Sequence, residues 1–302
     1  MLDEKPERIG DLVLGHVIGR GASGPVREGY ILSTNEIVAI KCFERDRPFQ
    51  PRNEKERVQD EIDVLKSLPA HSGLPKFVDA IDYPKSSSVY VAMEFVAGVQ
   101  LKTVVENQPE KSMKASKWLR NVFKQLLAAV DELHNAKIAH RDIAPDNILI
   151  TAGNRVVLVD FGNAVCLENK ATGTSSAGTL AFQAPEVASK LPTMDLYAAD
   201  VWAVGVTLFF CICGRLPIQE SSLMQTLLKV KSGDIAIPDN IQDATRDMLT
   251  ALLEPNVSAR PSAKEALGHV WFDLGDDVFP EEVSITPYQE TVSDLAKRYV
   301  RE

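Results

Sequence analysis

The hydrophobic pattern of this 302-residue chain changes its period near residues 97–98. Before that point, short runs rich in β-branched residues alternate with turns, as in 36–43 (EIVAIKCF), which is typical of strands. After it, apolar residues recur every three or four positions, most clearly over 119–133, which is typical of amphipathic helices. The chain is therefore predicted to be an α+β protein with a small, β-rich lobe followed by a larger, mainly helical lobe.

One helix is expected within the small lobe, because Val58, Ile62 and Leu65 are spaced to form a single buried stripe. The change of period also sets the predicted boundary between the two lobes, with the small lobe ending at residue 97 and the larger lobe beginning at residue 98.

Composition and charge exclude several classes of protein. The formal net charge is −9, from 42 acidic and 33 basic residues, and we expect no binding to nucleic acid because phosphate neutralisation needs clustered Lys and Arg. The longest apolar run, 201–213, is shorter than the roughly 20 residues of a membrane-spanning helix, so no membrane span is expected. The N-terminus lacks the apolar core of a signal peptide, and none of the 4 cysteines forms a CxxC pair. A reducing, cytoplasmic setting without disulfide or zinc chemistry is therefore expected.

Three glycines with the spacing G-x-G-x-x-G, at Gly19, Gly21 and Gly24, are followed by Val26. The pattern alone is a weak signal, since it also fits an ordinary tight hairpin turn. Here it lies between two predicted strands, whereas a dinucleotide-binding fold needs a helix to begin at the third glycine. A glycine hairpin can instead place backbone N–H groups over phosphates, with no side chain in the way.

Lys41 ends the apolar segment VAIK and has two possible interpretations. A lysine in an apolar strand usually points to solvent. However, Glu61 shares the predicted helix face of Val58 and Leu65, and a carboxylate on a buried face needs a partner. Lys41 is the candidate partner, and its ammonium group would then be placed to hold phosphate oxygens.

The most specific signal is the segment HRDIAPDN at 140–147, followed by a DFG segment that begins at Asp160. Together they place two carboxylates and an amide on loops beside short predicted strands. Such oxygen donors suit Mg²⁺, a hard cation that also binds phosphate oxygens. Asn147 and Asp160 are the candidate metal ligands, which leaves Asp142 to receive a hydroxyl proton. The histidine of HRDIAPDN is interpreted as a packed structural residue, because no second histidine accompanies it.

These elements resemble the eukaryotic protein kinase signature in order and spacing over roughly 10–272. The resemblance rests on the glycine loop, VAIK, Glu61, HRDIAPDN, DFG, APE at 184–186, DVW at 200–202 and Arg260. It implies the bilobal protein kinase fold and an enzyme that transfers the γ-phosphate of ATP, its co-substrate, to proteins. Its extent implies a kinase domain over 10–272, with lobes at 10–97 and 98–272, an N-terminal extension over 1–9 and a C-terminal tail over 273–302. The segment GTLAFQAPEV resembles Ser/Thr kinases. The chain looks most similar to the calcium/calmodulin-dependent kinase kinases and the liver-type upstream kinases of AMP-activated kinase, so other kinases' activation loops are among the expected substrates.

The resemblance also implies roles for individual residues. The residues expected to catalyse transfer are Asp142, Lys41, Glu61 and Thr179. Asp142 would be the base, Thr179 would hydrogen-bond to it, and Asn147 with Asp160 would hold Mg²⁺ (or Mn²⁺). The residues expected to bind ATP are Gly19, Gly21, Gly24, Val26, Ala39, Lys41, Met93, Glu94, Val96 and Leu149.

Within the ATP set, Met93 matches the gatekeeper position, and Glu94 and Val96 would offer backbone groups to adenine. Two further matches concern the framework. Glu186 would pair with Arg260 to brace the larger lobe, and Asp200 would begin a central buried helix.

Ala144 departs from the pattern, because Ser/Thr kinases normally carry a Lys two residues after the catalytic Asp. Pro145 and Asp146 follow, so no cation is restored locally, and an active but slow enzyme is expected. A pseudokinase scaffold with weak or no transfer is the alternative, supported only by Ala144. A small-molecule kinase is a third alternative, which the complete APE motif and Arg260 oppose.

Substrate choice and regulation are only partly predicted. Gln100 and Leu228 occupy two positions where basophilic kinases carry acids, while Asp146 keeps the third, so no strong demand for arginine at several upstream positions is expected. The candidates for activation-loop phosphorylation are Thr172, Thr174, Ser175 and Ser176. Activity is nevertheless expected without this phosphate. The tail is not expected to bind calmodulin, because acidic residues dilute the basic ones of its short predicted helix.

Overall fold

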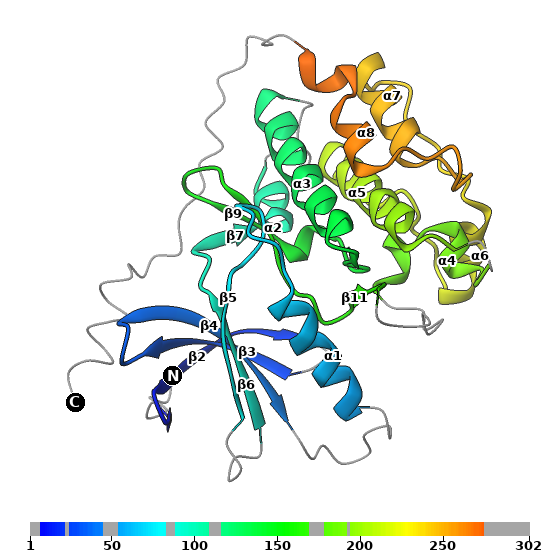
Figure 1. Cartoon of the computed structure of the whole chain (residues 1–302). Coiled ribbons are helices and arrows are strands. Elements are labelled where there is room, and N and C mark those ends of the chain that lie inside the picture. Colours follow the sequence, from blue (N-terminus) through cyan, green and yellow to red (C-terminus); the bar gives the residue numbers. More distant parts are fainter. Residues whose placement is uncertain are drawn as a thin grey trace.

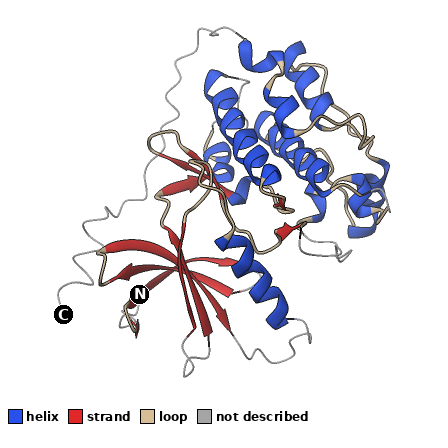
Figure 2. Ribbon diagram, viewed as in Figure 1, coloured by secondary structure: helices blue, strands red, loops and turns tan. Residues whose placement is uncertain are grey.

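The structure is a computed structural model of the whole chain (Figure 1). It describes residues 7–21, 24–44, 54–82, 88–108, 116–168, 178–191 and 194–274, and the statements below concern these residues. A curved sheet with one helix forms the small lobe, and a larger group of helices forms the other (Figure 2). The predicted bilobal α+β fold is confirmed.

The small lobe contains a six-stranded antiparallel sheet in the order β1-β2-β3-β4-β6-β5. The strands are β1 (Glu7–Ile9), β2 (Leu12–Gly21), β3 (Gly24–Ile31), β4 (Glu36–Glu44), β5 (Phe77–Asp82) and β6 (Ser88–Glu94). Strands β2 and β3 form the predicted glycine hairpin, in which Gly21 pairs with Gly24. Gly24 has φ 149°, a backbone conformation that residues with a Cβ rarely adopt.

The alternation of side chains along β4 explains how the sheet separates a core from a cleft. Val38, Ile40 and Cys42 belong to an apolar cluster on one face of the sheet. Lys41 and Phe43 point to the opposite face, because successive residues of a strand alternate. Phe43 there joins the main core of the protein. An apolar strand thus carries one lysine to the side that faces α1 and the larger lobe.

Helix α1 (Glu54–Lys66) covers that second face of the sheet (Figure 1). Ile62 and Leu65 are buried in the main core, and Val58 packs against it, as their spacing predicted. Glu61, on the same face, is also buried. The hydrophobic stripe therefore determines where the carboxylate points.

The larger lobe is built mainly of helices. Its helices are α2 (Leu101–Glu106), α3 (Lys117–Asn135), α4 (Pro185–Ala188), α5 (Leu196–Cys213), α6 (Leu223–Ser232), α7 (Asp243–Leu252) and α8 (Ala263–Leu267), with 3₁₀ turns at Pro145–Asn147, Leu180–Phe182 and Val270–Asp273. Helix α3 begins at the N-cap Ser116, whose side chain accepts from the backbone N–H of Leu119. Its apolar stripe is buried against α5 and α8.

Helix α5 begins earlier than predicted. Asp195, not Asp200, caps its first turn by accepting from the backbone N–H groups of Tyr197 and Ala198. The helix is long and apolar enough to cross a membrane by length and composition, and 72% of it is buried inside the protein. Core helices of folded proteins satisfy the same criteria, so this is weak evidence for a membrane span.

Short strands hold the loops that face the small lobe. A three-stranded sheet is formed by β7 (Gly98–Gln100), β9 (Ile148–Thr151) and β10 (Val156–Leu158), and a two-stranded ladder by β8 (Ile138–Ala139) and β11 (Val165–Cys166). The HRDIAPDN loop connects β8 to β9, and the DFG loop connects β10 to β11. The strand pairings β9–β10 and β8–β11 therefore bring both loops to the same side of the larger lobe.

Candidate active site

A cavity of about 240 Å³ lies between the two lobes. Most residues predicted to bind ATP or a metal line it, together with the predicted catalytic residue Glu61: Gly19, Val26, Ala39, Lys41, Met93, Glu94, Val96, Asn147, Leu149 and Asp160. Gly21 and Gly24 lie at the end of the β2–β3 hairpin. The fold thus gathers side chains from strands, a helix and two loops around one cleft.

Three charged side chains meet on one wall of this cavity. The Lys41 ammonium is hydrogen-bonded to Glu61 and lies 3.1 Å from Asp160 Oδ1. Burial alone would lower the pKa of Lys41, but the carboxylates of Glu61 and Asp160 outweigh burial and raise it. Burial would likewise raise the pKa of Asp160, but the ammonium group lowers it. Lys41 is therefore charged at neutral pH, as an ammonium group that holds phosphate must be.

The HRDIAPDN loop is held in place by Asp200 of α5. Its carboxylate accepts from the backbone N–H groups of His140 and Arg141, each at 2.8 Å. Arg141 has φ 66°, so the loop turns sharply just before Asp142. Asp200 therefore anchors this loop within the second turn of α5, which replaces the predicted role of beginning the helix.

His140 is a structural residue, as interpreted from the sequence. It is fully buried, its Nε2 lies 3.1 Å from the Val159 carbonyl oxygen, and its ring packs edge-on against Phe161. Burial lowers its pKa although Asp200, Asp142 and Asp160 act in the opposite direction. The ring is therefore neutral and joins the two loops by packing.

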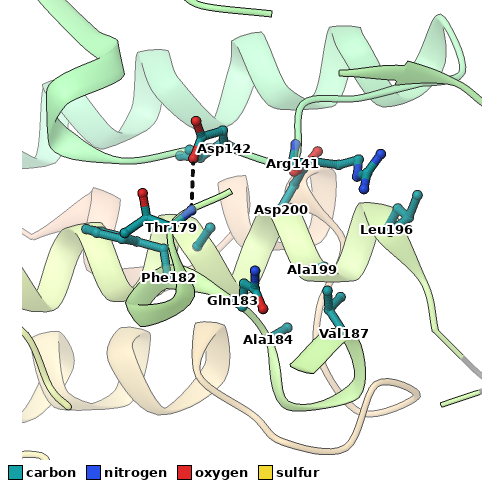
Figure 3. Close-up of a pocket in the computed structure, with 12 residues that line it drawn as sticks. Arg141, Asp142, Thr179, Phe182, Gln183, Ala184, Val187, Leu196, Ala199 and Asp200 are labelled. Atoms are coloured by element: carbon teal, nitrogen blue, oxygen red, sulfur yellow. Dashed lines mark hydrogen bonds between the residues drawn. The ribbon is translucent and has the colours of Figure 1, made fainter. Parts of the chain in front are cut away.

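Asp142 is held by backbone and side-chain donors. The Asn147 side chain donates to its carbonyl oxygen at 2.8 Å. Thr179 donates to its carboxylate through the backbone N–H at 3.3 Å, so the predicted hydrogen bond between these two residues is present (Figure 3). A Cβ on Gly178 would lie 2.5 Å from the Arg141 carbonyl oxygen, and this close approach requires glycine.

The candidate metal ligands fit a divalent cation that is shared with phosphate. Asn147 uses its amide nitrogen on Asp142, which leaves the amide oxygen as a possible ligand beside the Asp160 carboxylate. Among the described residues, no three Asp, Glu, His or Cys side chains gather to hold a metal by themselves. Mg²⁺ is commonly held by one or two protein side chains together with substrate phosphates and water. Asn147 and Asp160 match that kind of donor set.

Comparison with known protein families identifies the family to which this chain belongs. The model of the protein kinase domain matches residues 12–272. This chain belongs to the protein kinase family. The family uses ATP and a divalent metal ion in general, which agrees with the charged wall and oxygen donors of the cleft.

Curated relatives of this kinase domain are Ser/Thr protein kinases. Human Serine/threonine-protein kinase STK11 is 29% identical over 95% of this chain and 66% of its own length. The Dictyostelium discoideum stk11 homolog is 29% identical over 88% of this chain and 46% of its own length. CBL-interacting protein kinase 5 of rice, Oryza sativa subsp. japonica, is 30% identical over 87% and 56%, respectively. The chain thus spans about half to two thirds of these relatives, and the predicted resemblance to Ser/Thr kinases of the liver-type upstream group is confirmed.

The kinase hinge has a contact that the sequence did not indicate. Glu94, at the end of β6, lies 2.7 Å from Arg155 in the turn between β9 and β10. Burial would raise the pKa of Glu94, but Arg155 lowers it. Arg155 also donates to the Ser72 carbonyl oxygen at 2.7 Å. These contacts join the hinge to the larger lobe, and no local motif marks Arg155 in the sequence.

Two further residues near the catalytic loop were missed. The Lys102 ammonium lies 3.0 Å from Asp146 Oδ1, and the Asn163 amide donates to Asp142 Oδ2 at 3.1 Å. Lys102 is 44 residues from its partner, so local spacing could not identify the pair. Asn163 directly follows the DFG segment, which was the only available signal.

Several predicted sites lie outside the described residues. These are Thr172, Thr174, Ser175 and Ser176, the extension before Glu7, and the tail beyond Leu274. The proposals on loop phosphorylation and calmodulin therefore stay predictions.

Proposed function

We propose that this kinase domain transfers the γ-phosphate of ATP to Ser or Thr of protein substrates. The observation that carries the proposal is the charged cluster of Lys41, Glu61 and Asp160, which shares one cleft with Asn147, whose side chain in turn donates to Asp142. A pre-arranged cation and carboxylate set of this kind stabilises charge that moves during phosphoryl transfer.

The roles follow from the chemistry of each group. Lys41 would hold phosphate oxygens, because Glu61 and Asp160 keep its ammonium group charged and oriented. Asn147 and Asp160 would hold Mg²⁺, which neutralises phosphate charge when it is bound. Asp142 would accept the hydroxyl proton of the substrate, and its position is set by the loop that Asp200 anchors.

The adenine side of the cleft is apolar. Val26, Ala39, Met93 and Leu149 line it and would pack on the ring, as a flat heteroaromatic ligand requires. The backbone of Glu94 and Val96 would supply the polar contacts. A small pocket beside Asp142, lined by Phe182, Ala184, Val187 and others, would receive an apolar side chain of a protein substrate (Figure 3).

We further propose that upstream arginine is not required in substrates. Gln100 is neutral, Leu228 is 60% exposed, and Asp146 already pairs with Lys102. An arginine of the substrate would have to displace Lys102 to reach Asp146. Activation loops of other kinases remain candidate substrates, a proposal that rests on the family resemblance.

A pseudokinase scaffold is the second candidate, because Ala144 stands where a cation is usual. Alanine carries no charge, so this position supplies no cation to the transferring phosphate. The complete set of Lys41, Asn147 and Asp160 supports transfer over the scaffold. The two candidates differ in whether labelled phosphate reaches a protein.

The experiment is a transfer assay with radiolabelled ATP, Mg²⁺ and a generic protein substrate, followed by phosphoamino-acid analysis. Label on Ser or Thr is expected, and chelation of the metal should abolish it. Asp142→Asn serves as the matched control, because it keeps the side-chain volume and removes the base. ATP binding without transfer by the parent protein would support the scaffold instead, and label on a small molecule alone would support neither.

A further inference from the structure

Two uncharged donors hold the Asp142 carboxylate, one on each oxygen. The Asn163 side-chain amide donates to Oδ2 at 3.1 Å, and the Thr179 backbone N–H donates to Oδ1 at 3.3 Å. The donors come from opposite ends of the segment that leads from the DFG loop to α4. One donor on each oxygen restricts rotation of the carboxylate about its Cβ–Cγ bond.

We propose that Asn163 is a positioning residue that orients Asp142 to receive the substrate hydroxyl proton. The proposal rests on the function proposed above. A carboxylate oxygen has two lone pairs, so each oxygen retains one acceptor site after its present hydrogen bond. The carboxylate is therefore oriented without losing its capacity to accept the hydroxyl.

The backbone around Asn163 is fixed on both sides. Before it, the N–H of Gly162 donates to Asp160 Oδ1 at 3.3 Å. After it, the N–H of Ala164 donates to the Phe161 carbonyl oxygen at 3.0 Å, and Val165 begins strand β11. Because β11 pairs with β8, which leads directly into the HRDIAPDN loop, Asn163 and Asp142 are attached to the same short ladder.

The hydrogen bond between Asn163 and Asp142 matters more here because Ala144 replaces the lysine that is usual in Ser/Thr kinases. Ala144 has no polar side chain to place beside Asp142, so the orientation of the carboxylate depends on other donors. Thr179 supplies one from the backbone, and Asn163 supplies the one that a substitution can remove. Asn163 is also close in sequence to Asp160, so its substitution could lower kcat through the metal site. Such an effect would be the same whether residue 142 is Asp or Asn, so the double-mutant cycle below distinguishes it from positioning of Asp142.

The test is a double-mutant cycle with steady-state kinetics. Asn163→Leu removes the donor at similar volume and should lower kcat roughly tenfold, as expected for loss of a hydrogen bond to a charged group, with the KM for ATP unchanged. Asn163→His, which returns an N–H donor near the same place, should recover most of the loss. In the Asp142→Asn background, the same Asn163→Leu change should have no further effect.

Controls separate positioning from folding. Gln59→Leu removes a comparable amide bond to Asp63 on the exposed face of α1 and should leave kcat unchanged. All variants are checked for thermal stability and ATP binding, and Asn163→Ala, which removes the donor without adding a charge, substitutes if Asn163→Leu does not fold.

Two results would overturn the inference. One is an Asn163→Leu variant with the parent kcat, and the other is an equal loss in the parent and Asp142→Asn backgrounds. A parent protein that transfers no phosphate would refute the proposed function and this inference with it. An active parent with an equally active Asn163→Leu variant would refute the inference alone.

Discussion

Two buried ion pairs in this kinase domain have similar charges and different surroundings. The side chains of Arg260 and Glu186 are 0% and 2% exposed, and those of Lys41 and Glu61 are 3% and 4% exposed. The first pair lies inside the larger lobe, whereas the second lines the cleft between the lobes. Burial is therefore nearly equal, and the difference lies in what else each cation contacts.

The Arg260 guanidinium has its hydrogen-bonding capacity used within the fold. Its two terminal nitrogens donate to the two Glu186 oxygens at 2.8 and 3.1 Å. It also donates to the carbonyl oxygens of Ala198 and Glu254, each at 2.8 Å, and lies 5.0 Å above the Trp202 ring. The hydrogen bonds of this pair join α4, α5 and the segment before α8. Because the guanidinium group is buried and bonded within the fold, it is not placed to bind a ligand.

Lys41 has a different environment. Besides Glu61 it contacts Asp160, whose side chain is 35% exposed and lies on the other lobe. Its neighbours leave an open cavity beside it. An ammonium group that is charged, oriented and next to a cavity can be shared with phosphate. The comparison shows that burial and pairing alone do not identify a functional charge, whereas an adjoining cavity does.

The largest expected effect is on stability, from the first pair. Arg260→Ala should lower the free energy of unfolding by about 3–5 kcal/mol, because it leaves Glu186 buried and unpaired. Chemical denaturation measures the loss. Lys229→Ala, which breaks the exposed pair with Asp234, is the control and should cost less than about 1 kcal/mol. Equal effects of the two substitutions would contradict the structural role of Arg260.

The next effect is on activity, from the second pair. Lys41→Met should lower kcat by about 10²–10³, as expected when a group that stabilises transferring charge is removed. Its effect on the free energy of unfolding should be only about 1 kcal/mol, because removal of the ammonium group opens Glu61 to the adjoining cavity, where water would solvate it. Asp160→Ala should act similarly on transfer. Half the parent rate in either purified variant would show that this cluster does not carry the chemistry.

A smaller effect concerns the cation that is missing near Asp142. Ala144→Lys should raise kcat by about tenfold or more, since one electrostatic contact of this type contributes roughly 2–4 kcal/mol. The KM for ATP should change little. Parallel assays of parent and variant decide the point. A kcat that is unchanged or lower, with ATP binding intact, would show that another group already fills the gap.

The smallest effect concerns His140, which is buried neutral rather than paired. Because its folded pKa lies below the unfolded value of about 6.5, only the unfolded chain gains this proton as pH falls below that value. Stability should therefore decrease with falling pH, by at most about 1.4 kcal/mol per pH unit from this residue. His140→Gln should flatten the dependence between about pH 6.5 and 5. An unchanged slope in denaturation curves would refute this assignment.

Much of the site was predictable because each motif is local. The spacing of Val58, Ile62 and Leu65 placed Glu61 on the buried face of α1, and the need of a buried carboxylate for a partner pointed to Lys41, which the structure shows beside it. The phosphate-binding and metal-binding roles, which stay predictions, were inferred from residue types in short segments. These predictions needed only the periods of helix and strand and the preferences of oxygen ligands.

The start of α5 was predicted incorrectly, because a local pattern did not distinguish between two acidic residues. Asp200 and Asp195 are both acidic residues near the beginning of an apolar run, and the family pattern favoured the first. Capping needs free backbone N–H groups, which only the residue before the first turn can reach. The Asp195 carboxylate accepts from the free N–H groups of the first turn, whereas the Asp200 carboxylate accepts from the HRDIAPDN loop.

By itself, the sequence determined the two lobes, the glycine hairpin and the partner of Lys41, because each depends on regular periods or compact motifs. Only the tertiary structure decided the contacts of Asn163 with Asp142, Lys102 with Asp146 and Arg155 with Glu94. Those partners are 21 to 61 residues apart and lie on different elements. Their meeting depends on strand pairing and lobe packing, which no local pattern encodes.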